Sequence, residues 1–291
     1  MILVFKYIEM SWKDKFPKEN RYFETENGIL YKGECLEIMK KFQKESFGSI
    51  ITDPPYGTTS CSWDAVIPFD KMWESLKKIR KNCAPIVLFG SEPFFSTLIV
   101  SNIDEFKEEV IWLKNKSGSG LNANIKHIKV HEKIGVFGSS KSTFNPQKWL
   151  VDKREFLTQR KTFNEVEVGN NIYSKMKRVQ SRDNGERNPI SVVTARVPFT
   201  PSKTKKYNND VDLRFHPTQK PLALMEYLIK TYSNEGDLVL DFTCGSWTTL
   251  VACEKLNRRW IGIELNEEYC EIAKQRILEI NKTKTLFDKN S

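Results

Sequence analysis

The sequence predicts an α/β fold in which a mostly parallel, twisted sheet carries helices on both faces. Short, almost continuously apolar runs alternate along the chain with segments of helical spacing, and such runs are typical of parallel strands buried on both sides. The 291 residues are 39% hydrophobic and 29% charged, which is ordinary for a globular protein with one sizeable core. This composition excludes a chain that is disordered over most of its length.

The expected elements follow in order along the chain. Apolar runs bounded by Gly, Pro or polar residues predict strands over residues 28–32, 49–52, 86–90, 110–113 and 134–137. Apolar residues at helical spacing between these runs predict helices over 36–42, 72–79 and 94–100. Towards the end of the chain the same patterns predict strands over 238–240 and 260–263, and helices over 222–232, 248–256 and 269–280.

The stretch between these two patterned parts has a different character. Residues 138–215 are polar, basic, weakly periodic and interrupted by four prolines. We therefore expect a core built from residues 28–137 and 216–280, and a small, irregular, basic insert over 138–215. Residues 1–27 and 281–291 are expected to be terminal extensions, the second of them frayed.

The positive charge of the chain is concentrated in its middle. The net charge is +9, and residues 114–215 hold 21 Lys and Arg against 9 Asp and Glu, whereas the flanks on either side are close to neutral. A block this basic favours a surface that binds a polyanion. A solvated basic face is the plainer alternative.

Several classes of protein are excluded or disfavoured. No apolar run reaches the ~18 residues that a membrane span requires, so we expect no membrane contact and a cytoplasmic location. The six cysteines contain no CxxC pair and indicate reduced thiols. We expect no metal, because His127 and His131 are four residues apart but lack a third ligand.

The first chemical motif is Asp53-Pro54-Pro55-Tyr56, directly after the strand expected over 49–52. Its carboxylate therefore lies at the carboxyl end of a sheet strand, where α/β folds bind ligands. The two prolines fix the backbone and remove two donors. This combination suits a planar amine, because Asp53 and the Pro54 carbonyl can each accept one N–H while Tyr56 stacks on the ring. The alternative is a simple strand-ending turn.

The second motif occupies residues 241–249, between an expected strand and an expected helix. Gly245 permits a tight turn, and the helix presents its N-terminus to whatever lies above the strand. Glu264 ends the next strand, where an acidic residue can hold two ribose hydroxyls. The alternative is an ordinary turn in which Glu264 caps the following helix.

Together the two motifs resemble those of the DNA amino-methyltransferases that use S-adenosylmethionine. The order matches the permuted subgroup, in which the D-P-P-Y motif precedes the cofactor loop. The resemblance implies a Rossmann-like methyltransferase fold, with the basic block as the target-recognition region. The matching segments are residues 31–35, 53–56, 216–221 and 241–249, followed by Glu264.

The resemblance implies methyl transfer to the exocyclic N6 of adenine, with Asp53, Pro54, Pro55 and Tyr56 as the catalytic motif. Hydrogen bonds to Asp53 and to the Pro54 carbonyl would favour a tetrahedral nitrogen whose lone pair faces the methyl donor. The target base must first be flipped out of the duplex.

The resemblance also assigns a site for the cofactor, S-adenosylmethionine. Glu264 is expected at the ribose hydroxyls and Glu34 near the adenine amine. Lys220 is expected near the methionine carboxylate, in a segment that begins at His216. Trp247 stands where the family usually has glycine, so its indole either crowds the cofactor or lies against it. The cofactor loop supplies the further contacts Asp241, Phe242, Thr243, Gly245, Ser246 and Thr248.

Double-stranded DNA is the expected partner, and the basic block is expected to contact its phosphates. The resemblance also allows a homodimer and a cognate restriction endonuclease. The polar loop over 114–120 either contacts DNA beside the flipped base or is a plain surface connection. The candidate phosphate contacts are Lys153, Arg154, Arg178, Arg182, Lys203, Lys205 and Lys206.

Three alternative functions remain open. Cytosine-N4 methylation uses the same fold, although Asp rather than Ser at position 53 favours adenine within the family. Methylation of RNA is the second alternative. The third is a catalytically silent DNA-binding relative that no longer uses the cofactor, which Trp247 would favour and the intact motif from Asp53 to Tyr56 opposes.

Overall fold

The computed structural model divides the chain into two compact units. The larger unit combines Met1–Asn145 with Ser191–Ser291, and the smaller one is Pro146–Ile190. The structure describes residues 11–58, 64–117, 123–150, 186–198, 219–245 and 247–288.

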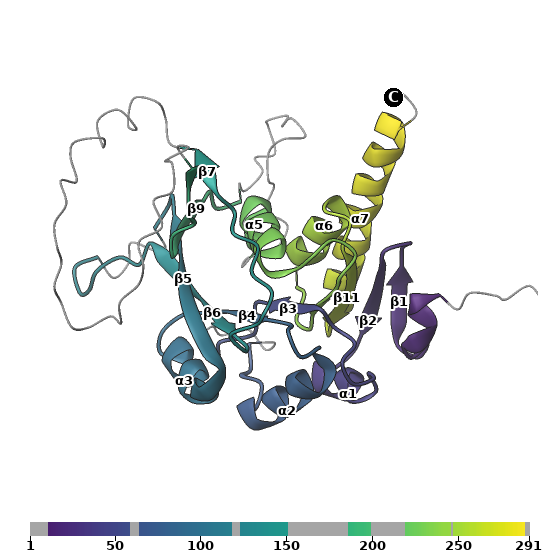
Figure 1. The fold of residues 1–291 in the computed structure, drawn as a ribbon, viewed down its shortest axis with the longest axis horizontal. Coiled ribbons are helices and arrows are strands. Elements are labelled where there is room, and N and C mark those ends of the chain that lie inside the picture. The colour runs from purple at the N-terminus through teal and green to yellow at the C-terminus, as the bar shows by residue number, and fades with distance from the viewer. Residues whose placement is uncertain are drawn as a thin grey trace, which may run out of the picture. The chain divides into compact units, whose positions relative to one another are not determined.

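The larger unit is built on one sheet, in which nine strands of the described residues have the order β1-β2-β11-β10-β3-β4-β6-β5-β9 (Figure 1). The five strands from β2 to β4 in this order run parallel, whereas β1, β6 and β5 each pair antiparallel with a neighbour. The bounds are β1 (Arg21–Glu24), β2 (Gly28–Lys32), β3 (Ser49–Thr52), β4 (Ile86–Gly90), β5 (Phe106–Lys114), β6 (His131–Phe137), β9 (Val192–Ala195), β10 (Leu238–Asp241) and β11 (Arg259–Glu264).

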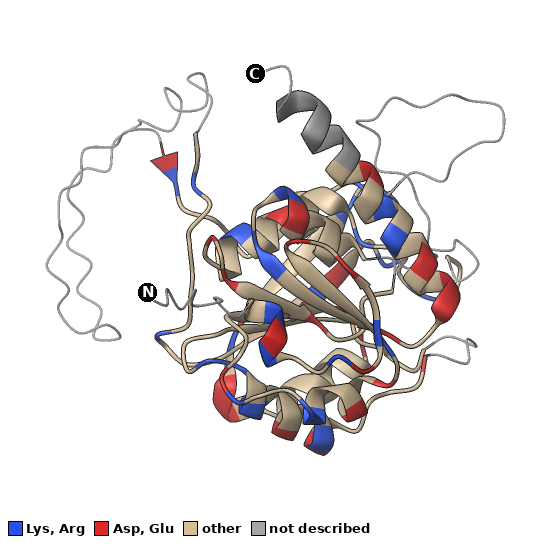
Figure 2. Ribbon diagram, turned by 90° about the vertical axis from the view of Figure 1, so that its right-hand side faces the viewer, with Lys and Arg blue, Asp and Glu red and all other residues tan. Residues whose placement is uncertain are grey.

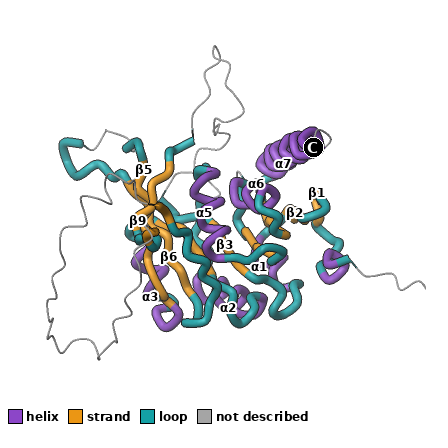
Figure 3. Tube along the Cα trace, turned by 45° about the horizontal axis from the view of Figure 1, so that its top comes forward, coloured by secondary structure: helices purple, strands orange, loops and turns teal. Residues whose placement is uncertain are grey.

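Helices cover both faces of this sheet (Figures 1 and 3). On one face lie α1 (Cys35–Lys40), α2 (Phe69–Ile79) and α3 (Phe94–Val100), which share a hydrophobic core with the sheet. On the other lie α5 (Leu222–Tyr232), α6 (Thr248–Lys255) and α7 (Glu267–Asp288), with a second core. The central strands are buried because both faces are covered. The predicted α/β fold is confirmed.

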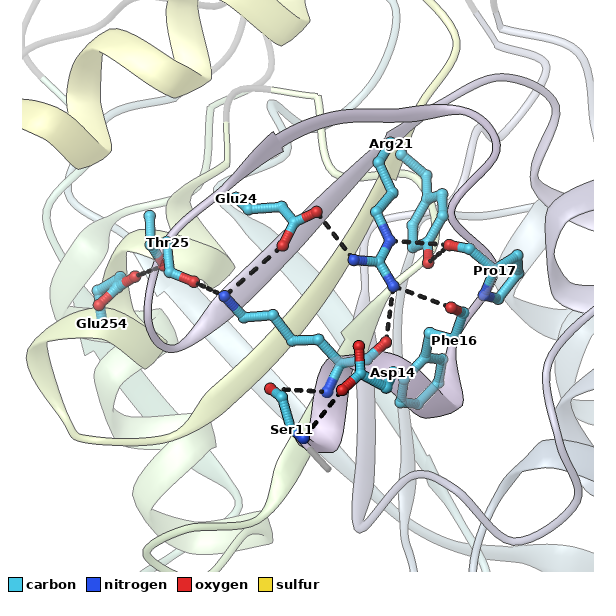
Figure 4. Close-up of polar contacts among 10 residues, drawn as sticks. Ser11, Asp14, Phe16, Pro17, Arg21, Glu24, Thr25 and Glu254 are labelled. Carbon is cyan, nitrogen blue, oxygen red and sulfur yellow. Dashed lines mark hydrogen bonds and ion pairs between the residues drawn. The ribbon is translucent and has the colours of Figure 1, made fainter. Parts of the chain in front are cut away.

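Polar contacts fasten the start of the chain to the first hairpin (Figure 4). The 3-10 helix η1 (Trp12–Lys15) precedes β1, and the Arg21 guanidinium donates to the carbonyls of Lys13, Phe16 and Pro17. Arg21 also pairs with Glu24 at 2.8 Å. Glu254 of α6 accepts a hydrogen bond from Thr25 at 2.5 Å. The Arg21 guanidinium thus supplies donors to three backbone carbonyls of the segment before β1.

Several elements differ from the sequence-based expectation. The strands β1 and β9 were not expected, and both occupy edges of the sheet. The last helix is longer than expected, because α7 continues to Asp288 through a segment without Gly or Pro. Residues 281–288 are therefore helical rather than frayed, and 289–291 lie outside the described residues. A second 3-10 helix, η2 (Ile103–Glu105), follows α3. The strand β9 lies in the stretch 138–215, and the division into a core and an insert with those bounds stays a prediction.

The smaller unit contains a short antiparallel pair, β7 (Trp149–Leu150) with β8 (Glu186–Arg187). Its Lys148 pairs with Glu186 at 3.1 Å. Over the described part of the protein, Lys and Arg positions are interspersed with Asp and Glu (Figure 2). No helix within the described ranges is long and apolar enough to cross a membrane.

Candidate active site

A cavity of about 450 Å³ lies at the carboxyl ends of the central strands. Here β3 and β10 are neighbours, but the chain leaves β3 through α2 towards β4 and leaves β10 through α6 towards β11. Because α2 and α6 lie on opposite faces of the sheet, the connections diverge and leave a crevice between them. The motif after β3 and the motif after β10 both line this cavity.

Hydrogen bonds join the two motifs directly. The Thr243 hydroxyl donates to the Asp53 carbonyl at 3.2 Å, and the Thr52 hydroxyl donates to the Asp241 carboxylate. The hydroxyl oxygens of Thr52 and Thr243 are 3.0 Å apart. Residues separated by about 190 positions in the sequence therefore form one connected wall of the cavity.

Asp64 fixes the loop that follows the first motif. Its carboxylate accepts hydrogen bonds from the backbone N–H groups of Tyr56, Gly57 and Thr58 at 2.8, 2.9 and 2.9 Å. The Tyr56 ring packs on Phe94 of α3, with ring centroids 5.1 Å apart and planes 31° apart. The position of the Tyr56 ring is therefore set before any ligand binds.

Four charged side chains form one group of ion pairs that includes Asp53 of the first motif. We call this group, Asp53, Lys114, Glu132 and Lys220, the charge cluster. Lys220 pairs with Asp53, and its Nζ lies 3.3 Å from the Glu132 carboxylate. Glu132 of β6 also pairs with Lys114 of β5. The Tyr56 hydroxyl donates to the second oxygen of Asp53.

The pKa values of the two carboxylates in the charge cluster are shifted in opposite directions. Burial raises the pKa of Asp53, although the Lys220 ammonium opposes the rise. Burial also penalises the charged form of Glu132, but Lys220 and Lys114 together bring the pKa of Glu132 below its ordinary value. The pKa of Lys220 is raised because Asp53 and Glu132 outweigh the effect of burial. Glu132 thus holds its negative charge more firmly than Asp53 does.

The carboxylates on the other side of the cavity, Asp241 and Glu264, accept hydrogen bonds from neutral groups. Asp241 is bonded by the Thr52 hydroxyl and, at 3.3 Å, by the Thr243 amide. Glu264 is bonded by the Gly245 and Asn266 amides, each at 2.8 Å. Gly245 has φ +47°, a left-handed conformation that favours glycine. We call Asp241 and Glu264 the neutral-donor acids.

Burial raises the pKa of both neutral-donor acids. It raises the pKa of Asp241 to about 6, although the hydroxyls of Thr249 and Thr52 oppose the rise. It also raises the pKa of Glu264, against the opposing effect of the Asn266 and Gly245 amides. Within the described ranges no ion pair reaches either carboxylate. Among the described residues, this side of the cavity therefore holds two carboxylates without a cation to balance them.

Glu34 also lines the cavity, but its carboxylate has a local partner. It is the N-cap of α1 and accepts hydrogen bonds from the Leu36 and Glu37 amides at 3.0 and 2.8 Å. Such a cap stabilises the helix by about 1 kcal/mol. The expected contact of Glu34 with the cofactor adenine stays a prediction.

The structure gathers most of the predicted site residues around the one cavity. Ser246, His216 and the seven candidate phosphate contacts Lys153, Arg154, Arg178, Arg182, Lys203, Lys205 and Lys206 lie outside the described residues. The predicted residues that line the cavity are Glu34, Asp53, Pro54, Pro55, Tyr56, Lys220, Asp241, Phe242, Thr243, Gly245, Thr248 and Glu264.

Trp247 behaves in neither of the two expected ways. It is fully buried, does not line the cavity and packs against Trp260 of β11, with ring centroids 6.2 Å apart. Its backbone has φ +67°, and this left-handed conformation at the N-cap of α6 turns the indole into the core. The large side chain therefore takes up no space in the cavity beside the loop over 241–249.

Four residues of the site were not predicted from the sequence: Thr52, Asp64, Lys114 as a cavity-lining residue, and Glu132. Thr52 and Asp64 are single polar residues beside the first motif, and nothing in their spacing marks them. Glu132 gives a weak signal, because it is an acid two residues before the apolar run 134–137. Its partner Lys220 is 88 residues away, so only the fold reveals the pair.

The chain is similar to known DNA methylases over most of its length. Residues 48–275 match the family N6_N4_Mtase, described as DNA methylase. The type II methyltransferase M.HpaI of Haemophilus parainfluenzae is 29% identical over 84% of this chain and 72% of its own. The DNA adenine methyltransferase YhdJ of Escherichia coli K12 is 26% identical over 88% of this chain and 84% of its own.

Solved structures of such enzymes share the fold. A complex of M1.HpyAVI with SAM superposes with a TM-score of 0.53 at 24% identity and covers 86% of this chain and 99% of that one. The cytosine-N4-specific PvuII DNA methyltransferase superposes with a TM-score of 0.60 at 17% identity, covering 89% of each chain. The Rossmann-like methyltransferase fold is thereby confirmed.

Proposed function

Because the chain belongs to the N6_N4_Mtase family of DNA methylases, we propose that it methylates the N6 of an adenine flipped out of double-stranded DNA, with S-adenosylmethionine as donor. The observation that carries the proposal is the Asp53 carboxylate, held at the end of β3 beside the Tyr56 ring in a cavity that also contains Glu264. The relative YhdJ, described as a DNA adenine methyltransferase, supports adenine as the base.

The neutral-donor acids fit S-adenosylmethionine. Its sulfonium supplies an electrophilic methyl group and, like its amino group, carries positive charge. Asp241 is buried and bonded to neutral donors, so a cation nearby would favour its ionised form. Each Glu264 oxygen accepts one amide hydrogen and keeps a second lone pair for a hydroxyl. The relative M1.HpyAVI forms a complex with SAM.

The residues of the first motif would orient the target amine. The N6 lone pair of adenine is delocalised into the ring, which makes it a weak nucleophile. One N–H bonded to Asp53 and the other to the Pro54 carbonyl favour a tetrahedral nitrogen whose lone pair faces the methyl group. Asp64 fixes the loop and Phe94 fixes the ring of Tyr56. Binding of the target base therefore requires little further ordering of these groups.

The proton of the amine can leave after methyl transfer, so Asp53 need not be a strong base beforehand. Its raised pKa nevertheless makes it a better acceptor than an exposed aspartate, because burial penalises its charged form. The Tyr56 hydroxyl donates to Asp53 and so holds the carboxylate in one orientation.

The basic block over 114–215 supports DNA rather than a small molecule as substrate. If its Lys and Arg contact phosphates, the affinity for DNA should fall about 10²- to 10⁴-fold between 50 and 200 mM salt. Filter binding or fluorescence anisotropy with an unmodified duplex measures this slope. A flat salt dependence would contradict the assignment.

The proposal is tested by the product. The protein is incubated with unmethylated genomic DNA and labelled S-adenosylmethionine, and the nucleosides are separated by chromatography and identified by mass spectrometry. We expect N6-methyladenine. Sequencing that detects the modified positions then gives the recognition sequence, and a dispersed pattern would contradict site specificity, which the type II relatives favour.

Cytosine-N4 methylation is the second candidate, favoured by the family itself and by the shared fold of the PvuII enzyme. N4-methylcytosine as the product would replace the first proposal by this one. Transfer to an RNA acceptor in preference to DNA would contradict both. DNA affinity without measurable binding of S-adenosylmethionine by calorimetry would favour a silent DNA-binding protein.

A homodimer, a cognate restriction endonuclease and a cytoplasmic location stay predictions. Sedimentation of the purified chain with and without duplex DNA tests the dimer. A separate endonuclease that is blocked by this chain's methylation would establish the second partner.

A further inference from the structure

The charge cluster places an ammonium group between two carboxylates at the wall of the cavity. The side chains of Lys220 and Glu132 are 8% and 16% exposed, so water screens their charges poorly. The Lys220 ammonium also lies 5.0 Å from the Phe89 ring centroid, against an apolar surface. In such surroundings each charge requires a counter-charge.

The charge cluster contains two carboxylates and two ammonium groups, so its formal charges balance. Lys220 bridges Asp53 and Glu132, and Lys114 adds a second cation at the other oxygen of Glu132. Because Lys220 is shared, the loss of one carboxylate contact leaves the other in place. The four side chains come from β5, β6, the end of β3 and the segment before α5, so the tertiary fold alone assembles them.

Each oxygen of Asp53 already accepts one hydrogen bond in this arrangement. One accepts the hydrogen bond of the Tyr56 hydroxyl and the other accepts from Lys220. Methylation of an exocyclic amine requires Asp53 to accept an N–H of the target base. That N–H bonds to an oxygen that already accepts one donor, so it competes with the Lys220 ammonium for the negative charge of Asp53. A second anion within reach then keeps the buried ammonium in place.

We propose that Glu132 is a positioning residue that retains the Lys220 ammonium when Asp53 binds the target amine. Glu132 lies 3.3 Å from the same Nζ atom, so a small shift of the lysine suffices. The inference rests on the proposed function, because it assigns the step at which Asp53 accepts the amine.

The directions of the pKa shifts in the charge cluster agree with this role. Lys220 and Lys114 bring the pKa of Glu132 below its ordinary value despite burial, whereas burial raises the pKa of Asp53. Glu132 is therefore the carboxylate that keeps its charge for the ammonium. Lys114 supports the arrangement by pairing with the Glu132 oxygen that Lys220 does not contact.

The test begins with Glu132→Gln, which removes the charge and keeps the shape. We expect kcat for DNA methylation to fall about 10- to 100-fold, since a buried ion pair is lost at the step where Asp53 binds the amine. The KM for S-adenosylmethionine should stay within about threefold, because Glu132 belongs to the other side of the cavity. Glu132→Asp, which keeps a carboxylate, should recover part of the lost kcat.

The matched control is Glu109→Gln. Glu109 of β5 forms a similar ion pair with Lys133 of β6, at 3.2 Å, but it does not line the cavity. Its loss should leave kcat within about twofold of the original protein, because a half-exposed ion pair contributes little. A general weakening of the β5–β6 pairing would affect both variants.

A double substitution separates positioning from a purely structural role. Without the ammonium there is nothing for Glu132 to hold, so Glu132→Gln combined with Lys220→Met should be no slower than Lys220→Met alone. If Glu132→Gln by itself fails to fold, this comparison still provides the test, because the double variant removes both members of the Lys220–Glu132 ion pair. A double variant more than about threefold slower than Lys220→Met overturns the inference.

The remaining outcomes are equally decisive. An unchanged kcat for Glu132→Gln, or a loss of kcat matched by an equal rise in KM for S-adenosylmethionine, overturns the inference and leaves the proposed function intact. If the original protein transfers no methyl group in the same assay, the proposed function fails and the inference with it.

Discussion

The two sides of the cavity hold their buried carboxylates in opposite ways. In the charge cluster, Asp53 and Glu132 are paired with ammonium groups, so the charges balance within the protein. The neutral-donor acids Asp241 and Glu264 receive only hydroxyl and amide hydrogens among the contacts of the described part. The unbalanced side suits a cationic ligand, and the balanced side suits chemistry at a neutral amine.

This difference predicts that substitutions on the two sides have separable effects. Changes in the charge cluster should act on the rate of transfer, and changes in the neutral-donor acids should act on cofactor affinity and on the pH dependence of stability. The following experiments test that separation.

The largest effect is expected for Asp53→Ala. The variant removes the acceptor of the target amine, so kcat for methylation should fall by at least about 1,000-fold. Binding of S-adenosylmethionine, measured by calorimetry, should stay within about threefold, because the neutral-donor acids are untouched. A parallel loss of cofactor binding would show that the two sides do not work separately.

The next effect concerns Asp241 in the cofactor-free protein. Its pKa in the fold is raised to about 6, so the stability it contributes is complete at pH below its ordinary value and is lost as the pH rises through about 6. Asp241→Asn carries no such charge and should be more stable than the original at pH 8, by up to about 3 kcal/mol. Thermal unfolding measured from pH 3 to 8 gives the difference.

At pH 3, below the ordinary pKa of an aspartate, the two proteins should unfold at nearly the same temperature, which serves as the internal control. If Asp241→Asn is the less stable protein at pH 8, the carboxylate has a cation partner and the contrast between the two sides is wrong.

A smaller effect is expected for Glu264→Ala. We expect binding of S-adenosylmethionine to weaken about 10- to 100-fold, the value of one or two hydrogen bonds to a charged group. At saturating cofactor kcat should change little. Glu268→Ala is the control, since this exposed acid near the start of α7 does not line the cavity. Equal losses in both variants would indicate a general effect of charge.

The smallest effect is expected for Trp247→Phe. Because the indole lies in the core and its Nε1 has no hydrogen-bond partner among the described residues, the affinity for S-adenosylmethionine should stay within about twofold. Unfolding should become easier by about 1–3 kcal/mol, because a fully buried ring is made smaller. A clear change in cofactor affinity would place the indole at the cavity after all.

The sequence predicted the buried elements better than the edges. The strands β3 and β4 and the helices α3 and α5 match the expected ranges, because strands covered on both faces are continuously apolar and the helices carry an apolar stripe. The edge strands β1 and β9 are only partly buried and owe their conformation to one neighbouring strand. Their own residues gave no such signal.

The candidate site divides in the same way. The two motifs were identified from residue types at short range, since Asp53 to Tyr56 and residues 241–249 are contiguous segments. Glu132 could not be identified, because its function depends on Lys220 and Asp53, which are distant in sequence. The direction of the Trp247 indole likewise depends on a left-handed backbone and on a place in the core.

The amino-acid sequence by itself determined the α/β class, the order of the elements and the two loops that carry the chemistry, because periodicity and short motifs are local properties. The tertiary structure alone decided which charges balance one another and which carboxylates lack a cation. Electrostatic energies depend on distance and burial in space, and neither quantity is written in the spacing of residues along the chain.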